Sequence, residues 1–218
     1  HYVNNGYRES RTTDSFDEWS YLASHTDLIN AFGNDTAAAT RHYVNNGYRE
    51  SRTTDSFDEW SYLASHTDLL NAFGNDTAAA TRHYVNNGHR ESRSTDSFDE
   101  WSYLASHTDL INAYGNDTAA ATRHYVNTGY GQSRSTDSFD EWSYLASHTD
   151  LINAYGNNTA AATRHYVNHG FSESRSTDSF DEVRYLSLHS DLQAAFGSDT
   201  AAATRHYVNH GYSEGRAI

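Results

Sequence analysis

The sequence repeats itself every 41 residues. The stretch from Asp14 to Tyr48, DSFDEWSYLASHTDLINAFGNDTAAATRHYVNNGY, returns with few changes until the chain ends. Such a period predicts a tandem array, in which each unit buries its apolar face against its neighbours. We expect a single array and, because the chain opens without Met and inside what the later copies predict to be a helix, an excerpt of a longer protein. The copies span 1–41, 42–82, 83–123, 124–164 and 165–205, with a remnant at 206–218.

The composition must be weighed against this periodicity. A formal charge of −14 and few aliphatic residues would by themselves suggest disorder. However, the chain holds 17 Tyr, 9 Phe and 4 Trp, and each aromatic side chain can bury roughly 150–250 Å². The acidic surface has no Lys, which argues against nucleic acid and anionic membranes as partners. No apolar run approaches the roughly 20 residues that would cross a bilayer.

Local signals predict three short helices in each copy. Ser15 and Glu18 form a capping-box pattern that would begin a helix over residues 16–24. Phe16 and Trp19 lie three residues apart, as on one buried helix face. We therefore expect the tryptophan ladder to be part of the core; a stacking platform for sugars or peptides is the alternative. The ladder consists of Trp19, Trp60, Trp101 and Trp142.

The other two helices follow directly. Thr26 is placed to cap a second helix over residues 27–32. Asn34 or Asp35 would begin a third helix that ends at Gly47, a residue suited to a left-handed C-terminal position. The fold class expected is therefore an all-α repeat solenoid of five units, each with about three short helices. No single copy should fold alone, because its helices are too short to persist without packing.

The fifth copy departs most from the others. Val183 replaces the tryptophan, Arg184 and Leu188 each replace a serine, and Gln193 replaces an apolar residue. Terminal repeats face solvent or a different neighbour, so atypical residues are expected there. We interpret the fifth copy as a cap or as the junction to another module.

The residue types of a hydrolytic triad occur at Ser24, His25 and Asp27. Neighbours at a helix end cannot easily form that relay, and the fifth copy has Leu188 in place of the serine. We therefore expect no enzymatic activity and no cofactor. The absence of Cys excludes disulfides and thiolate metal sites.

Two histidines recur in each copy, first as His25 and His42. The favoured interpretation is a partly buried imidazole that forms hydrogen bonds between helices; a ladder of metal sites is the alternative. Protonation of all 14 histidines would remove the formal charge of −14. We therefore predict that mild acid promotes association, and light scattering that stays flat from about pH 7.5 to 5 would exclude it.

Two acidic or amide groups could hold Ca²⁺, namely Asp14 with Asp17 and Glu18, and Asn34 with Asp35. Neither has the alternating ligands of an EF-hand, and helix capping explains both. The glycosylation pattern N-x-T also suits a helix start, so it indicates modification only weakly. It begins at Asn34, Asn75, Asn116 and Asn157.

Tyr and Arg are common in protein interaction surfaces, and several of them recur without an assigned place in the core. With the recurrent histidines, they form our set of candidate interaction residues. The set is Tyr7, Tyr21, His25, Arg41, His42, Tyr48, Tyr62, His66, Arg82, Tyr103, His107, Tyr144 and His148.

The pattern Y-L-A-S-H-x-D-L-I-x-A-F-G…A-A-A-T-R-H-Y-V-N-x-G-Y-x-E-G-R resembles a repeat of about 40 residues in large bacterial secreted or surface proteins. These repeats often lie beside RTX-type calcium-binding repeats or adhesin modules. The resemblance covers the whole chain and includes the ending Ser213-Glu214-Gly215-Arg216. It implies export and an extracellular role, but no common activity. The RTX nonapeptide itself is absent.

These observations favour a structural or adhesive segment of a bacterial extracellular or cell-surface protein, either a spacer or a self-associating scaffold. The expected partners are further copies of the chain, other surface proteins or glycans. The alternative function is a binding solenoid that holds a peptide or glycan on its concave face.

Overall fold

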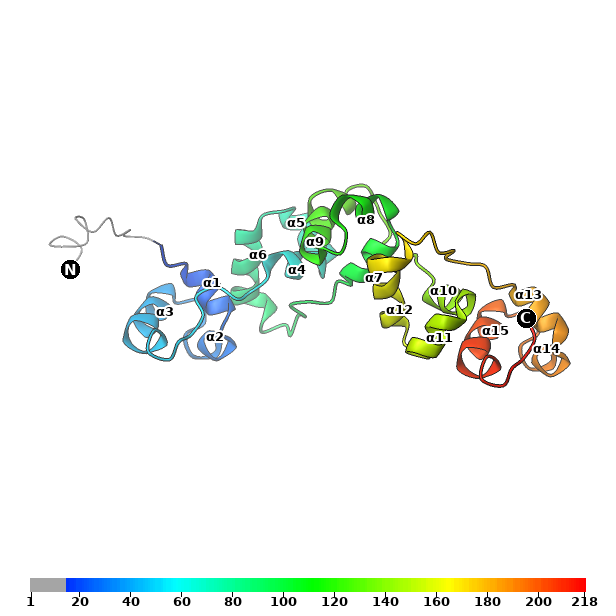
Figure 1. The fold of residues 1–218 in the computed structure, drawn as a ribbon. Helices are drawn as coiled ribbons and strands as arrows, with labels where there is room; N and C mark the ends of the chain where they lie inside the picture. The colour runs from blue at the N-terminus through cyan, green and yellow to red at the C-terminus, as the bar shows by residue number, and fades with distance from the viewer. Residues whose placement is uncertain (1–14) are drawn as a thin grey trace. The chain divides into compact units, whose positions relative to one another are not determined.

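The computed structural model describes residues 15–218, and every repeat in this range folds into three short α-helices followed by one π-helical turn (Figure 1). The prediction of an all-α tandem repeat with three helices per unit is confirmed. No strand occurs among the described residues. We name the structural repeats one to five. Their ranges are 15–55, 56–96, 97–137, 138–178 and 179–218.

The helices recur in the same order in each repeat. The first helices are α1 (Glu18–Ala23), α4 (Glu59–Ala64), α7 (Glu100–Ala105), α10 (Glu141–Ser147) and α13 (Glu182–Leu188). The second helices are α2 (Thr26–Phe32), α5 (Thr67–Phe73), α8 (Thr108–Tyr114), α11 (Thr149–Tyr155) and α14 (Ser190–Phe196). The third helices are α3 (Thr36–His42), α6 (Thr77–His83), α9 (Thr118–His124), α12 (Thr159–His165) and α15 (Thr200–His206). The π-helical turns are η2 (Tyr43–Gly47), η3 (Tyr84–Gly88), η4 (Tyr125–Gly129), η5 (Tyr166–Gly170) and η6 (Tyr207–Gly211).

The chain divides into two compact units. Unit 1 holds the described residues up to Phe98 together with Thr122–Gln132, and unit 2 holds Asp99–Ala121 and Ser133–Ile218. In unit 1, α1 packs against α3 of its own repeat and against α6 and η3 of the next. In unit 2, α10 packs in the same way against α12, α15 and η6. A first helix therefore needs the following repeat to cover it.

The start of the first helix differs from the predicted capping box. Asp17, not Ser15, is the N-cap, and its carboxylate accepts hydrogen bonds from the backbone N–H groups of Trp19 and Ser20 at 2.9 and 3.0 Å. The helix begins at Glu18, so Phe16 lies before the cap. Its ring packs 5.3 Å from that of Tyr21, the contact known as a hydrophobic staple. The expected place of Phe16 on the helix is therefore wrong, whereas burial at this position is confirmed in repeats two to five, where Phe57, Phe98, Phe139 and Phe180 are 5–7% exposed.

The second helix begins one residue earlier than predicted, at Thr26, and its N-cap His25 makes no side-chain capping bond. Leu28 and Ile29 are its buried residues, and Gly33 closes it with φ of +59°. At seven residues the helix is held by packing, as its length requires.

The helical stretch of the third helix ends at Gly47, as predicted, although its last turn is the π-helical η2. Asp35 caps it, and the N–H of Tyr48, directly after η2, donates to Tyr43 O at 2.9 Å. The left-handed residue is Ser51, with φ of 56°, and not Gly47. Bonds from Ser51 N and Arg52 N back to the preceding turn complete a Schellman ending. The fifth repeat has Gly215 at the position of Ser51, the residue that this φ favours.

Gly47 and its equivalents are glycines for a different reason. A Cβ at Gly88 would meet the hydroxyl oxygen of Tyr62 and lie 3.2 Å from the ring of Tyr84. The π-helical turn thus brings its backbone against a buried phenol, where only glycine leaves room.

Candidate functional site: the interface between neighbouring repeats

A buried ring cluster holds each repeat together, and a tyrosine of the first helix lies at its centre. In repeat two, Tyr62 is 0% exposed, and its hydroxyl lies 3.0 Å from His83 Nδ1. The rings of Phe57 and Tyr84 lie 5.5 and 5.4 Å from its own. Burial raises the pKa of Tyr62 to about 12 and lowers that of His83, so both groups are neutral at pH 7. The pair is therefore a neutral structural hydrogen bond.

An ion-pair cluster joins the second helix to the linker of the same repeat. Arg93 bonds to Asp68 at 2.8 Å and to Glu91 at 2.7 Å, and its side chain is 25% exposed. Burial acts to raise the pKa of Asp68, but the hydrogen bond and charge of Arg93 outweigh it, and the pKa is lowered. His66 Nε2 lies 2.8 Å from Ser94 O and fixes the same linker. The cluster recurs around Arg52, Arg134, Arg175 and Arg216.

A second set of hydrogen bonds joins each repeat to the next. Ser65 Oγ, at the end of α4, accepts from the backbone N–H of Ser97 at 2.7 Å. Asn75 Nδ2 donates to Asn127 Oδ1 at 2.7 Å. The serine bond recurs as Ser24–Ser56, Ser106–Ser138 and Ser147–Ser179, and the asparagine bond as Asn34–Asn86, Asn116–Asn168 and Asn157–Asn209. These bonds fix the register of one repeat on another.

The four tryptophans are half-buried rather than in the core as predicted, and Trp101 lies at the interface between repeats three and four. In unit 2, the guanidinium carbon of Arg164 lies 5.8 Å from the ring centroid of Trp101, a cation–π contact. Between α7 and α12 a cleft of only about 110 Å³ remains. It is lined by Asp99, Trp101, Ser102, Glu141, Thr159, Ala160, Thr163 and Arg164.

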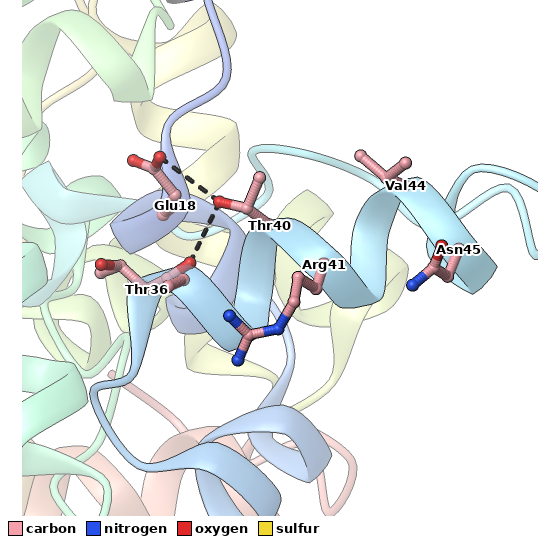
Figure 2. A pocket seen from close by; sticks show the side chains of 7 residues that line it. Glu18, Thr36, Thr40, Arg41, Val44 and Asn45 are labelled. Atoms are coloured by element: carbon pink, nitrogen blue, oxygen red, sulfur yellow. Dashed lines mark hydrogen bonds between the residues drawn. The ribbon is translucent and has the colours of Figure 1, made fainter.

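Among the described residues, no helix covers the corresponding face of repeat one. A cleft of about 520 Å³ lies over α1, α3 and η2, and Figure 2 shows Thr36, Thr40, Arg41, Val44 and Asn45 along it with Glu18 beside them. Thr40 Oγ1 donates to Thr36 O at 3.0 Å. Val44 is 68% exposed, whereas its equivalent in repeat two, Val85, is 4% exposed. We call this surface the repeat-one face. It is lined by Glu18, Thr36, Ala37, Thr40, Arg41, Val44 and Asn45.

Repeat five has different residues at the positions through which repeats one to four contact the following repeat. Val183 occupies the position of the tryptophan and is 68% exposed. Leu188 occupies the position of the serine that bonds to the next repeat and is 48% exposed. Arg184 replaces a serine that is 5–6% exposed in the other repeats. Ala194 and Ser198 replace the asparagines that bond to the next repeat. We call the exposed side of α13 and α14 the repeat-five face.

The residues of repeat five that contact repeat four are unchanged. Thr204 is 3%, Tyr207 3% and Val208 5% exposed, as their equivalents in the inner repeats are. Its internal ion pair, between Arg216 and Asp191 at 2.8 Å, is also kept. The substitutions in repeat five therefore lie on the side that would face a following repeat, and the side that faces repeat four is unchanged. The sequence prediction noted four of them, but could not tell that they share one face.

The candidate interaction residues occupy several environments. Four of the predicted tyrosines are 0% exposed and are core residues, so they offer no surface for a partner: Tyr21, Tyr62, Tyr103 and Tyr144. Four histidines contact backbone carbonyls of their own linkers: His25, His66, His107 and His148. Arg41 and Arg82 are exposed, His42 bonds to Tyr21, and Tyr48 is 74% exposed. Tyr7 lies outside the described residues. The sequence prediction missed Val44 and Thr40.

The side chains considered for catalysis have other partners. Ser24 Oγ donates to Ser20 O and accepts from the next repeat, and Asp27 pairs with Arg52 at 2.9 Å. His25 does not bond to either of them in the structure; its Nε2 contacts Thr53 O. Among residues 15–218 no group of three or more His, Cys, Asp or Glu side chains is placed to hold a metal ion.

Comparison of the chain with protein-family models, curated proteins and solved structures finds no match. In the described part of the chain, no helix has the length and apolar character that crossing a membrane requires. The resemblance to a bacterial surface repeat therefore stays a prediction.

Proposed function

We propose that this chain is a structural spacer, a repeat segment of a bacterial extracellular or cell-surface protein whose length is set by the number of copies. The observation that supports this is the recurrence of the same cross-repeat hydrogen bonds at 41-residue intervals, as at Asn34–Asn86 and Asn75–Asn127. An array joined in this way gains length by adding units without redesigning any contact. The extracellular location rests on the sequence resemblance.

The polar side chains support a structural role rather than a chemical one. The buried Tyr62–His83 pair is neutral, and one arginine of each linker, Arg93 in repeat two, is held by carboxylates of the same repeat. A reaction centre needs polar groups that are not already engaged in hydrogen bonds or ion pairs and that point at a substrate. Here these groups bond within a repeat or to the next one.

The experiment varies the number of copies. Chains in which residues 56–96 are removed, kept or duplicated would carry fluorescent labels at both ends, and the end-to-end distance would be measured by energy transfer. We expect the distance to grow by a constant increment with each copy. As a control, a flexible Gly/Ser insert of equal length should add distance only in proportion to about the square root of its length. A distance independent of copy number would refute the proposal.

One observation favours a binding function as the second candidate. A cleft of about 530 Å³ lies between repeats one and two in unit 1, lined by apolar, amide and basic groups that include Ile29, Val85, Asn86 and Arg90. Pockets of this size can hold a short peptide or an oligosaccharide. Arrays of peptides and glycans would test it, with Arg90→Ala as the variant that should lose any signal.

A further inference from the structure

The repeat-one face and the filled interface in unit 2 are built from the same residues. The face is lined by Glu18, Thr36, Ala37, Thr40 and Arg41, and the interface by their equivalents in repeat four. The difference is that α7 and its N-cap contribute Asp99, Trp101 and Ser102 to the filled interface. With this helix in place the cleft is about 110 Å³, against about 520 Å³ at the repeat-one face.

The chemistry of the repeat-one face matches the helix that fills its equivalent. Arg164 stacks on Trp101 at 5.8 Å, whereas the side chain of the equivalent Arg41 is 67% exposed and lies 4.0 Å from Asp35. Val44 is exposed where Val85 is covered by α1 of repeat one. The face therefore presents an exposed cation and an apolar side chain to an occupant with an indole ring.

The repeat-five face lacks the side chains through which α7 fills the interface in unit 2. At the positions of Trp101 and Ser102 it presents Val183 and Arg184. A valine has no ring for Arg41 to stack on, and Arg184 would bring a second positive charge to a position that is 5% exposed when occupied by Ser102. Leu188 replaces the serine whose Oγ receives the backbone N–H of the next repeat.

We propose that the repeat-one face docks the first helix of a further repeat of the tryptophan type, E-W-S-Y-L-A, and that repeat five terminates the array because its first helix cannot make this contact. The repeat-one face would thus accept a further repeat, whereas the repeat-five face would not. This inference rests on the proposed structural function and names the partner of the repeat-one face.

The first test measures whether an added repeat covers Val44. The chain has no cysteine, so Val44→Cys introduces a single thiol on an exposed position. Residues 1–14 have the same sequence as residues 42–55, and a copy of residues 15–41 placed ahead of His1 therefore completes a repeat. We expect thiol labelling to slow by at least about tenfold in the extended chain, because it then requires local opening.

The matched control uses an added copy with the residues of repeat five, in which its tryptophan is Val and its two serines are Arg and Leu. Here labelling should stay as fast as in the original chain. Equal protection by both added copies would overturn the role of repeat five as terminator, and protection by neither would overturn the docking site. Circular dichroism would confirm that the added residues are helical.

The second test uses the chain at its original length. Val183→Trp with Arg184→Ser and Leu188→Ser should give repeat five a tryptophan-type helix, so that copies join head to tail and the weight-average mass at least roughly doubles with concentration. Adding Val44→Asp should restore the monomer, since Val44 is exposed and its change leaves the fold intact. A folded triple variant that stays monomeric would overturn the proposal. None of these results changes the end-to-end distances that test the spacer function.

Discussion

Replacing Gly88 by alanine tests the contact that organises each repeat. By helix propensity alone, alanine at a helical position should stabilise the chain by about 1 kcal/mol relative to glycine. The structure predicts the opposite sign, because the new Cβ would meet the hydroxyl oxygen of Tyr62 and lie 3.2 Å from both Tyr62 Cζ and the ring of Tyr84. Tyr62 is 0% exposed, so its ring cannot move away freely.

The magnitude follows from these opposing effects. Overpacking of a buried site costs about 1–3 kcal/mol, and the propensity gain offsets part of it, so Gly88→Ala should destabilise by roughly 1–2 kcal/mol. Tyr62→Phe removes the hydroxyl and with it the bond to His83, at a cost of about 1 kcal/mol. In the Tyr62→Phe background the alanine should cost close to nothing. The two changes should therefore couple by about 1–2 kcal/mol.

The assay is urea denaturation followed by circular dichroism, with the shift in midpoint compared at unchanged m-value. Gly131→Ala is the control, because its Cβ would lie 3.6 Å from Thr128 O, an ordinary contact, and it should be near neutral. If Gly88→Ala stabilises the chain, or costs the same with and without the Tyr62 hydroxyl, the steric explanation of this glycine is wrong.

Three further predictions follow from the same structure. Ser92→Gly should stabilise the folded chain by roughly 0.5–1 kcal/mol, because Ser92 has φ of 55° in the left-handed region that favours glycine. Thr95→Gly is the control and should give no such gain, because Thr95 lies outside that region. Thermal melts of both variants would measure the difference. Burial lowers the pKa of His83, His165 and His206 below 6.5, so the unfolded chain takes up these protons first. The stability present above about pH 6.5 should therefore fall as pH drops toward the folded pKa, as denaturant midpoints across pH would measure. Val85→Ala should cost about 2 kcal/mol, whereas Val44→Ala should change the unfolding free energy by less than about 0.5 kcal/mol; equal effects would contradict the exposure of the repeat-one face.

The sequence by itself determined the period, the helical class and the number of helices in a repeat. These follow from local signals, since a cap such as Asp35 and a stop such as Gly33 act on the chain within a few residues. For the same reason the predicted helix positions were correct to within a few residues.

Tertiary structure decided which residues are buried. The first helix has six residues, fewer than two turns, so the spacing of Phe16 and Trp19 could not define its buried face. The structure places Tyr21 in the core and the tryptophan at the contact with the next repeat. Gly47 is a glycine because of that tyrosine, 26 positions earlier in the sequence, and no local pattern carries the information. A helix face becomes core only when a neighbour covers it, and in this chain the neighbour is the next repeat.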